Sequence, residues 1–391
     1  MGPPADGPPA PARSGPPVLH VRGRVLADAP DAAAGHVEVR DELWVVDGRV
    51  TWTRPARLRA DAVEVSGWVL PGLVDAHCHV GLGPDGAVDR DTARAQAQAD
   101  RDAGALLLRD AGSPVDTRWV DAEEDLPRVV RAGRHVARTR RYLRGVAHEV
   151  EPDQLPDAVR AQARAGDGWV KLVGDWIDRE RGDLAPCWPL AQLRAAVAAA
   201  HEEGARVAVH TFSEEALPDL LAAGVDCLEH GTGLDEATVA TAAARGTAVT
   251  PTLVNVETFP AIAAQGEAKF PRYAAHMRAL HARRRATAAM AAEAGVRLLV
   301  GTDAGTRLPH GMVAAEVAAL AGAGVGPLRA LDAAAWGARR YLGHPVLEEG
   351  APADLVVLDA DPREDVAALA HPRAVVLRGR VVGGRVAGPV R

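Results

Sequence analysis

A His-x-His pair, His77 and His79, ends the apolar run VLPGLVDA. In an extended strand, residues two apart point to the same face, so both imidazoles can reach one metal ion while Cys78 points away. A lone pair of this kind also occurs as two ordinary polar residues at a strand end. The pair therefore indicates a metal site only if other ligands accompany it.

Four other polar residues stand where a later apolar run gives way to a loop. In a parallel barrel the C-terminal ends of all strands open onto one face, so such side chains converge there. Any one buried histidine is usually a hydrogen-bonded core residue, but a whole set at strand ends favours a metal site. The four are Lys171 in WVK, His210 in RVAVH, His230 in DCLEH and Asp303 in LLVGTD.

Lys171 is unusual because arginine is the cation that this chain otherwise uses. Of 45 basic residues, only Lys171 and Lys269 are lysine, and Lys269 lies in the polar stretch EAKFPRY. A buried ammonium is costly, so a lysine inside WVKLV suggests a need for a primary amine. Two chemistries use one: Schiff-base formation, and reaction with CO2 to give a carbamate that bridges two metal ions. The histidines favour the carbamate, because its negative charge offsets two cations.

The composition is that of a globular protein with a large core. Of 391 residues, 48% are hydrophobic and 25% charged. No apolar run approaches the roughly 18 residues of a membrane span. The net charge of −7 is spread along the chain without a basic block, which argues against a nucleic-acid partner. Three cysteines without a C-x-x-C fit free thiols in a reducing compartment, so we expect a cytoplasmic protein.

The elements that must position the candidate ligands lie in the middle of the chain, residues 71–345. Short apolar runs alternate there with alanine-rich amphipathic segments, and glycines stand where helices should stop. This alternation predicts an α/β fold, and a (β/α)8 barrel of the TIM type explains it best. An open doubly wound sheet is the competitor, but no G-x-G-x-x-G opens a helix. The expected strands are GLVDAHCH, ALLLRDAG, WVKLVGD, RVAVHTF, DCLEHGT, TAVTPTL and RLLVGTD.

The two ends of the chain have a different character. Residues 1–17 are rich in Pro, Gly and Ala, which predicts a disordered tail. Residues 18–70 and 346–391 carry short β-type runs punctuated by Asp-Gly and Gly-Arg turns. Neither end has a full complement of strands alone. We therefore expect the termini to pair into one small β-sandwich domain, with the barrel inserted between its halves.

The candidate ligands, together with the sequence motifs around them, resemble those of the amidohydrolase superfamily. The branch is the one whose binuclear metal centre is bridged by a carboxylated lysine. The resemblance runs from about residue 18 to residue 385 and is closest to the imidazolonepropionase-like group, which includes Xaa-Pro-type dipeptidases. The matching motifs are LPGLVDAHCH, LLRDAG, LEHG, PTL, GTDAG and GAPADLVVLDADP.

This resemblance implies a metal-dependent hydrolase that cleaves an amide-type or cyclic amide C–N bond of a small substrate. Zinc is the first choice of metal, with manganese, iron or cobalt as alternatives. A hydroxide between the two ions is the nucleophile, and Asp303 takes its proton and passes it to the leaving nitrogen. The implied ligands are His77, His79 and Asp303 for one ion, His210 and His230 for the other, and a carbamate on Lys171 between them.

The resemblance also bears on the residues that select the substrate. In dipeptidase-like relatives, a histidine on an early barrel loop and a tyrosine two residues after the fifth-strand histidine assist substrate binding. Here the second position is Phe212, which lacks a hydroxyl, and His148 in YLRGVAHEV is the candidate for the first. Because of this departure, the substrate can equally be a dipeptide, another small amide or a lactam. Loop residues that could bind an acidic group near the mouth are Tyr142, Arg144, Arg307 and His310.

Other functions stay open at this point. A Xaa-Pro-type dipeptidase would differ from the main hypothesis only in its substrate. A non-catalytic scaffold would be expected to have lost ligands, and all six candidates are present. A homo-oligomer is compatible with the sequence. A mononuclear deaminase or imidazolone hydrolase of the same fold would use an unmodified Lys171 together with His77, His79, His210 and Asp303.

Overall fold

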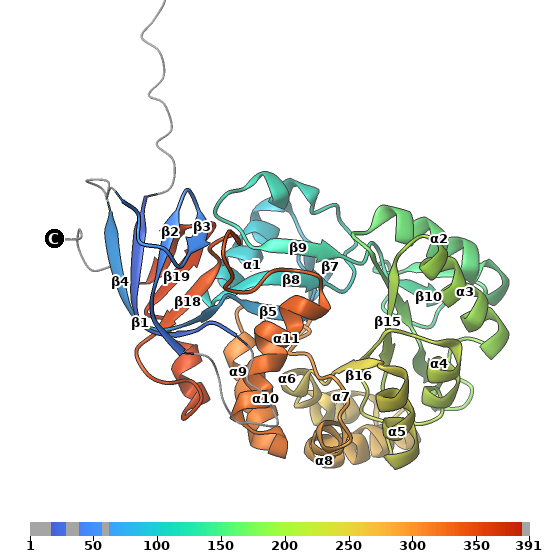
Figure 1. Ribbon diagram of the computed structural model, residues 1–391. Coiled ribbons are helices and arrows are strands. Elements are labelled where there is room, and N and C mark those ends of the chain that lie inside the picture. Colours follow the sequence, from blue (N-terminus) through green and yellow to red (C-terminus); the bar gives the residue numbers. More distant parts are fainter. Residues whose placement is uncertain (1–16, 29–38, 57–61, 385–391) are drawn as a thin grey trace, which may run out of the picture.

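The computed structural model describes residues 17–28, 39–56 and 62–384. Strands from both ends of the chain lie together on one side of the molecule, and the strands and helices of the middle lie on the other (Figure 1). The content is mixed α/β, as predicted. The predicted tail, residues 1–17, lies outside the described residues except for Pro17.

Two parallel sheets run through the middle of the chain. Their strands are largely buried, as expected for apolar runs that helices cover. One sheet contains β5 (Leu73–Cys78), β8 (Ala105–Asp110) and β9 (Arg128–Arg131). The other contains, in spatial order, β11 (His148–Val150), β10 (Val136–Arg138), β12 (Trp169–Val173), β15 (Arg206–Thr211), β16 (Cys227–His230) and β17 (Ala248–Thr250).

Residues 297–304 connect the two sheets. The Leu299 amide donates to the Val249 carbonyl (2.9 Å), and the Asp303 amide donates to the His77 carbonyl (2.7 Å). We predicted a strand in this segment, but it makes only isolated bridges. One buried cluster combines Leu299 with side chains from β5, β8, β9, β12, β15, β16 and β17. These strands therefore share an inner core.

Helices occupy most of the connections between these strands and surround them (Figure 1). Gly224 and Gly246, which end two of them, have left-handed backbone (φ 87° and 72°), so two of the predicted helix stops are confirmed. The helices are α1 (Arg90–Asp102), α2 (Leu155–Ala165), α3 (Leu190–Glu202), α4 (Leu217–Ala223), α5 (Glu236–Arg245), α6 (Leu253–Val256), α7 (Phe259–Gly266), α8 (Pro271–Glu293), α9 (Val313–Leu320), α10 (Pro327–Ala334) and α11 (Trp336–Tyr341).

One element near the strand ends was not predicted from the sequence. An antiparallel hairpin, β13 (Asp175–Asp178) and β14 (Asp183–Pro186), follows β12. After β17, α6, α7 and α8 lead back to residues 297–304, and side chains of all three helices pack with Phe212 in one buried cluster. These additions build walls around the ends of the parallel strands.

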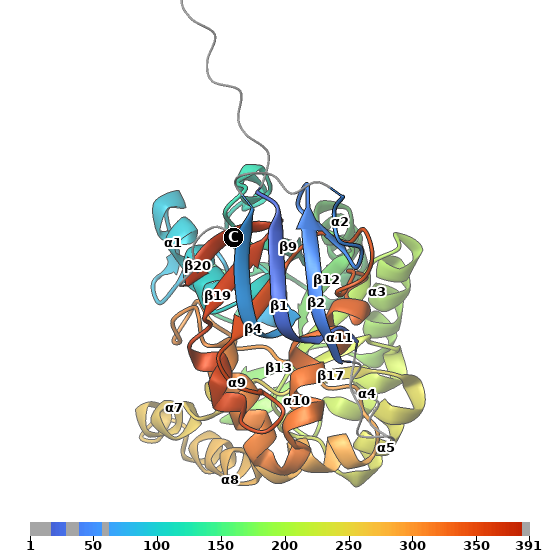
Figure 2. The same cartoon turned by 60° about the vertical axis from the view of Figure 1, so that its left-hand side comes forward.

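Among the described residues, the strands of the two termini form one continuous sheet, and Figure 2 shows these strands side by side. This pairing of the termini is as predicted, whereas the two-layer sandwich and the domain boundaries at 70/71 and 345/346 stay predictions. The sheet has its own buried core. Its order is β20 (Arg380–Gly384), β19 (Ala374–Leu377), β18 (Leu355–Leu358), β4 (Val63–Pro71), β1 (Leu19–Leu26), β2 (Val39–Val46) and β3 (Arg49–Thr51).

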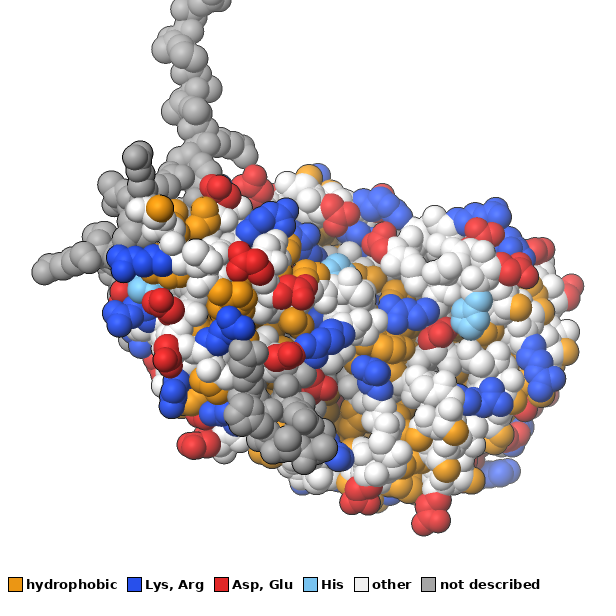
Figure 3. Space-filling model, viewed as in Figure 1, with side chains coloured by type: hydrophobic (Ala, Val, Ile, Leu, Met, Phe, Trp, Pro, Cys, Tyr) orange, Lys and Arg blue, Asp and Glu red, His pale blue; other side chains and the backbone are white. Residues whose placement is uncertain are grey.

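The surface carries acidic and basic side chains interspersed over the face shown in Figure 3. None of the helices in the described ranges combines the length and the apolar character needed to cross a membrane. The three cysteines, Cys78, Cys187 and Cys227, are buried free thiols, as predicted.

Candidate metal centre

His77, His79 and Asp303 meet at the end of β5. Their ligand atoms all lie within 4.8 Å of one another. Asp303 Oδ1 is 3.3 Å from His77 Nε2 and 3.0 Å from His79 Nε2. These spacings suit ligands of one ion, since two donors at about 2.0–2.1 Å from a metal lie roughly 3 Å apart. The structure thus brings three predicted ligands together, from residues more than 220 positions apart in the chain.

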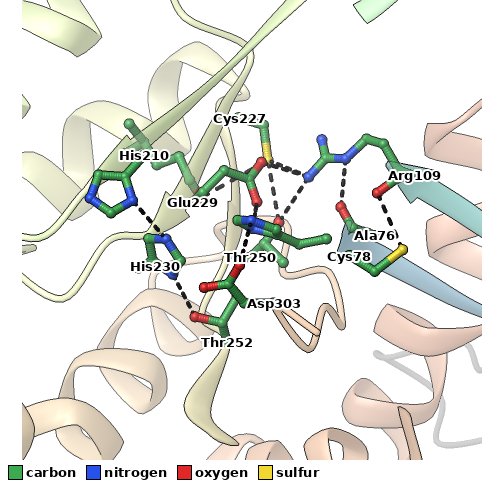
Figure 4. Close-up of polar contacts among 12 residues, drawn as sticks. Ala76, Cys78, Arg109, His210, Cys227, Glu229, His230, Thr250, Thr252 and Asp303 are labelled. Carbon is green, nitrogen blue, oxygen red and sulfur yellow. Dashed lines mark hydrogen bonds and ion pairs between the residues drawn. The ribbon is translucent and has the colours of Figure 1, made fainter. Parts of the chain in front are cut away.

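His210 and His230 form a second pair beside the first group (Figure 4). His230 Nε2 is 3.0 Å from His210 Nδ1, and the His230 and His77 ring centres are 5.1 Å apart. Thr252 Oγ1 lies 2.7 Å from His230 Nδ1, which leaves the Nε2 edge of that ring facing His210. Burial is the main cause that lowers the pKa of His230 to about 3 and the pKa of His210 well below its ordinary value. Both rings are therefore neutral and able to donate a lone pair to a metal.

Lys171 is buried in β12, with 1% of its surface exposed. Its Nζ has no hydrogen-bond partner among the described residues. Burial lowers the pKa of Lys171 to about 8, although Glu229 and Asp303 act in the opposite direction. A primary amine is thus held where its neutral form is accessible near neutral pH, which is the form that reacts with CO2.

The backbone at the site includes three residues in the left-handed region that are not glycine. They are His230 (φ 69°), Thr252 (φ 47°) and Asp303 (φ 58°). Such conformations cost energy for residues with a Cβ and occur where surrounding structure imposes them. All three residues leave the end of a parallel strand or its equivalent, so the strain turns their side chains toward the shared centre.

A buried ion pair, Glu229 with Arg109, lies behind His77. Glu229 Oε2 is 2.7 Å from His77 Nδ1, and Arg109 Nη2 donates to Glu229 Oε1 (2.6 Å; Figure 4). Arg109 also donates from Nε to the Ala76 carbonyl (2.6 Å) and lies over the Trp169 ring. Burial opposes the charge of Glu229, but Arg109 and His77 hold its pKa well below the ordinary value. The carboxylate thus fixes the orientation of His77.

Asp303 faces the open side of the centre. Its side chain is 16% exposed, and Asn255 Nδ2 donates to its Oδ2 (2.7 Å). Burial would raise the pKa of Asp303, but His77 and His79 hold it well below the ordinary value. This carboxylate is therefore ionised, and it can both bind a cation and accept a proton.

His135 is a site residue that the sequence analysis missed. Its fully buried ring stacks on His79 with centres 5.0 Å apart and lies 5.3 Å from Tyr142, and burial lowers its pKa well below the ordinary value. The predicted His148 is not brought to the site. It is exposed on β11, a strand at the edge of its sheet, and only its backbone amide contacts His135, at the carbonyl (2.7 Å).

His310 is likewise not part of the central cluster. Its Nδ1 lies 2.7 Å from Asp100 Oδ2 on α1, and the residue does not line the cavity described below. Burial opposes a charged imidazole here, but Asp100 raises the pKa of His310. The sequence alone could not place it, because the contact joins residues 210 positions apart.

A cavity of about 490 Å³ leads from the surface to His210 and Asp303. Its volume is typical of a site for a small molecule. Tyr142, one of the predicted mouth residues, lines it, as do Arg144 and Arg307. Aromatic residues form part of the remaining wall and come from the hairpin, the end of β15, α7 and α8: Trp176, Phe212, Phe259 and Tyr273.

Two of the missed residues carried a signal in the sequence. Arg109 in ALLLRD and Glu229 in DCLEH are charges inside otherwise apolar strands, and such charges are rarely buried unless they are paired. His135, Asn255 and Thr252 carried none, since each is an ordinary polar residue, two of them in loops and Asn255 in the short helix α6.

Comparison with known proteins places the chain in a family. The sequence profile of the Amidohydrolase family matches residues 68–382, and the chain belongs to that family. It is a hydrolase that acts on C–N bonds. The recognition of the amidohydrolase superfamily from the sequence is thus confirmed.

Particular relatives extend this result. An uncharacterized protein of Mycobacterium tuberculosis is 56% identical over 366 residues, which cover 93% of this chain and 96% of that protein. The structure of a Xaa-Pro dipeptidase with bound methionine has a TM-score of 0.77 at 23% identity, over 93% of this chain and 99% of that one. The structure of Aspergillus niger ochratoxinase has a TM-score of 0.77 at 20% identity, over 96% and 98%. At these identities the two structures establish a shared fold.

Proposed function

We propose that this protein is a binuclear metallohydrolase that cleaves an amide bond of a small substrate. Two divalent ions would be held by three nitrogen and oxygen donors on one side, two imidazoles on the other, and a carbamate on Lys171 between them. The observation that carries the proposal is the buried Lys171 amine, which has no hydrogen-bond partner among the described residues and interacts electrostatically with His210, His230 and Asp303. The ligands are His77, His79 and Asp303, then His210 and His230, with Lys171 as the bridge.

The residues present fit such a centre. Besides Lys171 Nζ, the buried His210 Nε2 lacks a partner among the described residues, so this pocket contains polar atoms that the protein itself does not satisfy. Neutral imidazoles and a carboxylate are donors that zinc accepts well, and manganese, iron and cobalt accept them too. The neutral Lys171 amine forms an N–C bond to CO2 and loses one proton, which places an anion between the two cations.

We further infer that residues 71–345 form the (β/α)8 barrel predicted from the sequence. The inference is supported by the hydrogen bonds of residues 297–304 to both parallel sheets and by the inner core that the strands share. In such a barrel the C-terminal strand ends, where all six ligands stand, line one mouth. The buried free thiols are consistent with the cytoplasmic location that we keep as a proposal.

The chemistry follows from the positions of the side chains. When bound, the two ions would polarise the scissile carbonyl and lower the pKa of a water molecule. Asp303 is ionised and open to the cavity, so it accepts the proton of the attacking water and returns it to the leaving nitrogen. Asn255 holds the Asp303 carboxylate through Oδ2 and leaves Oδ1 toward the histidines.

The substrate is proposed as a small amide, dipeptide-like in size. Neighbouring structures that are a prolidase and an ochratoxinase support this class. Phe212, two residues after His210, cannot offer a hydroxyl to a substrate, so the preference for proline dipeptides is not carried over to this chain. A mononuclear deaminase or imidazolone hydrolase remains the alternative, because it would use the same fold with an unmodified Lys171.

Metal content per chain tests the proposal. The protein is produced with zinc and bicarbonate, and the metal is counted by elemental analysis in wild type, Lys171→Ala and Lys269→Ala. Lys269 is exposed and is the only other lysine, so its variant is the matched control. We expect close to two metals in wild type and the control and a sharp loss in Lys171→Ala, with activity partly restored by short carboxylates. One metal, unchanged by either substitution, would favour the mononuclear alternative.

A further inference from the structure

His135 is a fully buried histidine whose two ring nitrogens have no hydrogen-bond partner among the described residues. It is not one of the residues that line the cavity reaching His210 and Asp303, so a substrate in that cavity does not contact it. Buried polar atoms in native proteins are rarely left without a partner. The ring therefore indicates a bound group inside the centre rather than a substrate in the cavity.

Strand pairing sets His135 beside Lys171. The strands β10 and β12 are parallel neighbours, with Val136 opposite Leu172. The His135 carbonyl accepts from the His148 amide of β11 (2.7 Å), so the strand backbone continues to this residue. The same register carried back by one residue brings His135 opposite Lys171. Because side chains alternate between the two faces of a sheet, these two side chains share one face.

The contacts of the His135 ring decide which nitrogen is free. The ring stacks on His79 and lies at a tilt to Tyr142, with centres 5.0 Å and 5.3 Å apart. A Cβ at Gly112 would come within 2.7 Å of Nδ1, so this edge of the ring lies directly over the glycine. An N–H there would find no acceptor, so the proton of the neutral imidazole belongs on Nε2. The Nε2 edge lies across the ring from Nδ1 and is turned away from Gly112, toward β12.

A neutral N–H donor suits an anion on Lys171. Both oxygens of a carbamate can accept hydrogen bonds in addition to binding a cation, and bonds to a charged acceptor are the strong ones. A second ammonium or guanidinium here would repel the two ions of the proposed centre. Burial, with His79 and Lys171 as further causes, lowers the pKa of His135 well below its ordinary value, so the ring supplies a donor without adding charge.

We propose that His135 is a positioning residue for the carbamate, and that its Nε2–H donates to a carbamate oxygen on Lys171. This bond would orient the carbamate between the two ions and favour carboxylation of the amine. The inference rests on the proposed function, because it requires the carbamate. It assigns His135 a role beyond its packing against His79.

Carbon-13 NMR and elemental analysis test the inference without measuring activity. Metal-free protein is incubated with zinc and increasing 13C-bicarbonate, and the carbamate signal and zinc per chain are recorded for wild type, His135→Asn, His135→Leu and His135→Phe. Asparagine and leucine are close in size, but only asparagine keeps an N–H donor, whereas phenylalanine keeps a ring against His79. His148→Asn is the control, because His148 is exposed on β11.

We expect the bicarbonate concentration for half-maximal carboxylation to rise at least tenfold in His135→Leu and His135→Phe. His135→Asn should recover part of this loss, and the His148 control should match wild type. A hydrogen bond to a charged group has an effect of that order. Melting temperatures identify any variant that fails to fold, and either apolar variant compared with wild type then still decides.

The outcomes separate this inference from the proposed function. Equal bicarbonate dependence in wild type and the folded His135 variants overturns the role of His135 and leaves the binuclear centre standing. A loss confined to His135→Asn and His135→Leu, with His135→Phe like wild type, also overturns it, because stacking on His79 then explains the effect. A wild-type protein with one zinc and no carbamate signal overturns both the inference and the proposed function.

Discussion

Asp303 combines a left-handed backbone, an ionised carboxylate and exposure to the cavity, a combination expected of a residue that both holds a cation and transfers a proton. No other acidic side chain within the described ranges shares its position between His77 and His79. The carboxylate is therefore the residue on which turnover should depend most directly.

We predict that Asp303→Asn abolishes turnover while much of the metal is retained. The amide keeps an oxygen that can bind a cation but cannot accept a proton, so kcat should fall by about a hundredfold or more. Elemental analysis and steady-state kinetics on the same preparation check this. Turnover close to that of wild type would contradict the role of Asp303 as a proton carrier.

Glu229 acts one step away from the ligands, through His77. Glu229→Gln replaces a charged acceptor by a neutral one at 2.7 Å from His77 Nδ1, so we predict metal affinity lower by about 10–100-fold. Competition with a chromogenic chelator measures it. Because Gln also leaves Arg109 without its anionic partner, the melting temperature is recorded in parallel. Unchanged affinity in a folded variant would show that Glu229 only supports Arg109.

At the scale of elements, α8 forms part of the wall of the cavity. Tyr273 at its start lines the cavity, and its apolar side packs with α7 and Phe212. His276 attaches the helix to the strand ends, since Nε2 lies 2.9 Å from Glu214 Oε2 and Nδ1 lies 2.9 Å from Asp183 Oδ1. The helix is thus held beside the cavity by two ion pairs, one at each nitrogen of the His276 imidazole.

This attachment should depend on pH. Glu214 and then Asp183 raise the pKa of His276 to about 9 from an ordinary 6.5. A raised pKa means that the stabilisation is complete below about pH 6.5 and is lost as pH rises through 9. We predict that wild type loses about 1–2 kcal/mol relative to His276→Gln over that range, allowing for solvent screening. Denaturant unfolding at pH 6 and pH 9.5 measures this difference, and parallel pH dependence in the two proteins would refute it.

At the scale of the whole molecule, the candidate centre joins parts that the chain keeps far apart. Its proposed ligands come from β5 and the residue that follows it, from β12, β15 and β16 in the other parallel sheet, and from residues 297–304, which connect the two sheets. Ions bound there would act as cross-links between these sheets. The terminal sheet adds a second buried core and contributes none of the proposed ligands.

We therefore predict that chelation lowers the melting temperature of the whole protein. A ligand that binds only the folded state stabilises it by roughly 2.7 kcal/mol at a hundredfold excess over its Kd. Calorimetric scans before chelation, after it, and after readdition of zinc with bicarbonate check the effect. Lys269→Ala should behave as wild type, whereas Lys171→Ala should gain little from added zinc. Identical scans in all states would argue against a structural link through the metal.

The sequence by itself determined which residues could be metal ligands and that parallel strands carry them, because each stands at the end of an apolar run whose local pattern is readable. Only the tertiary structure decided which residues distant in the sequence come into contact. Arg109 and Glu229 lie 120 positions apart, and His135 rather than His148 reaches His79 because β10 and β11 set which side chain faces inward.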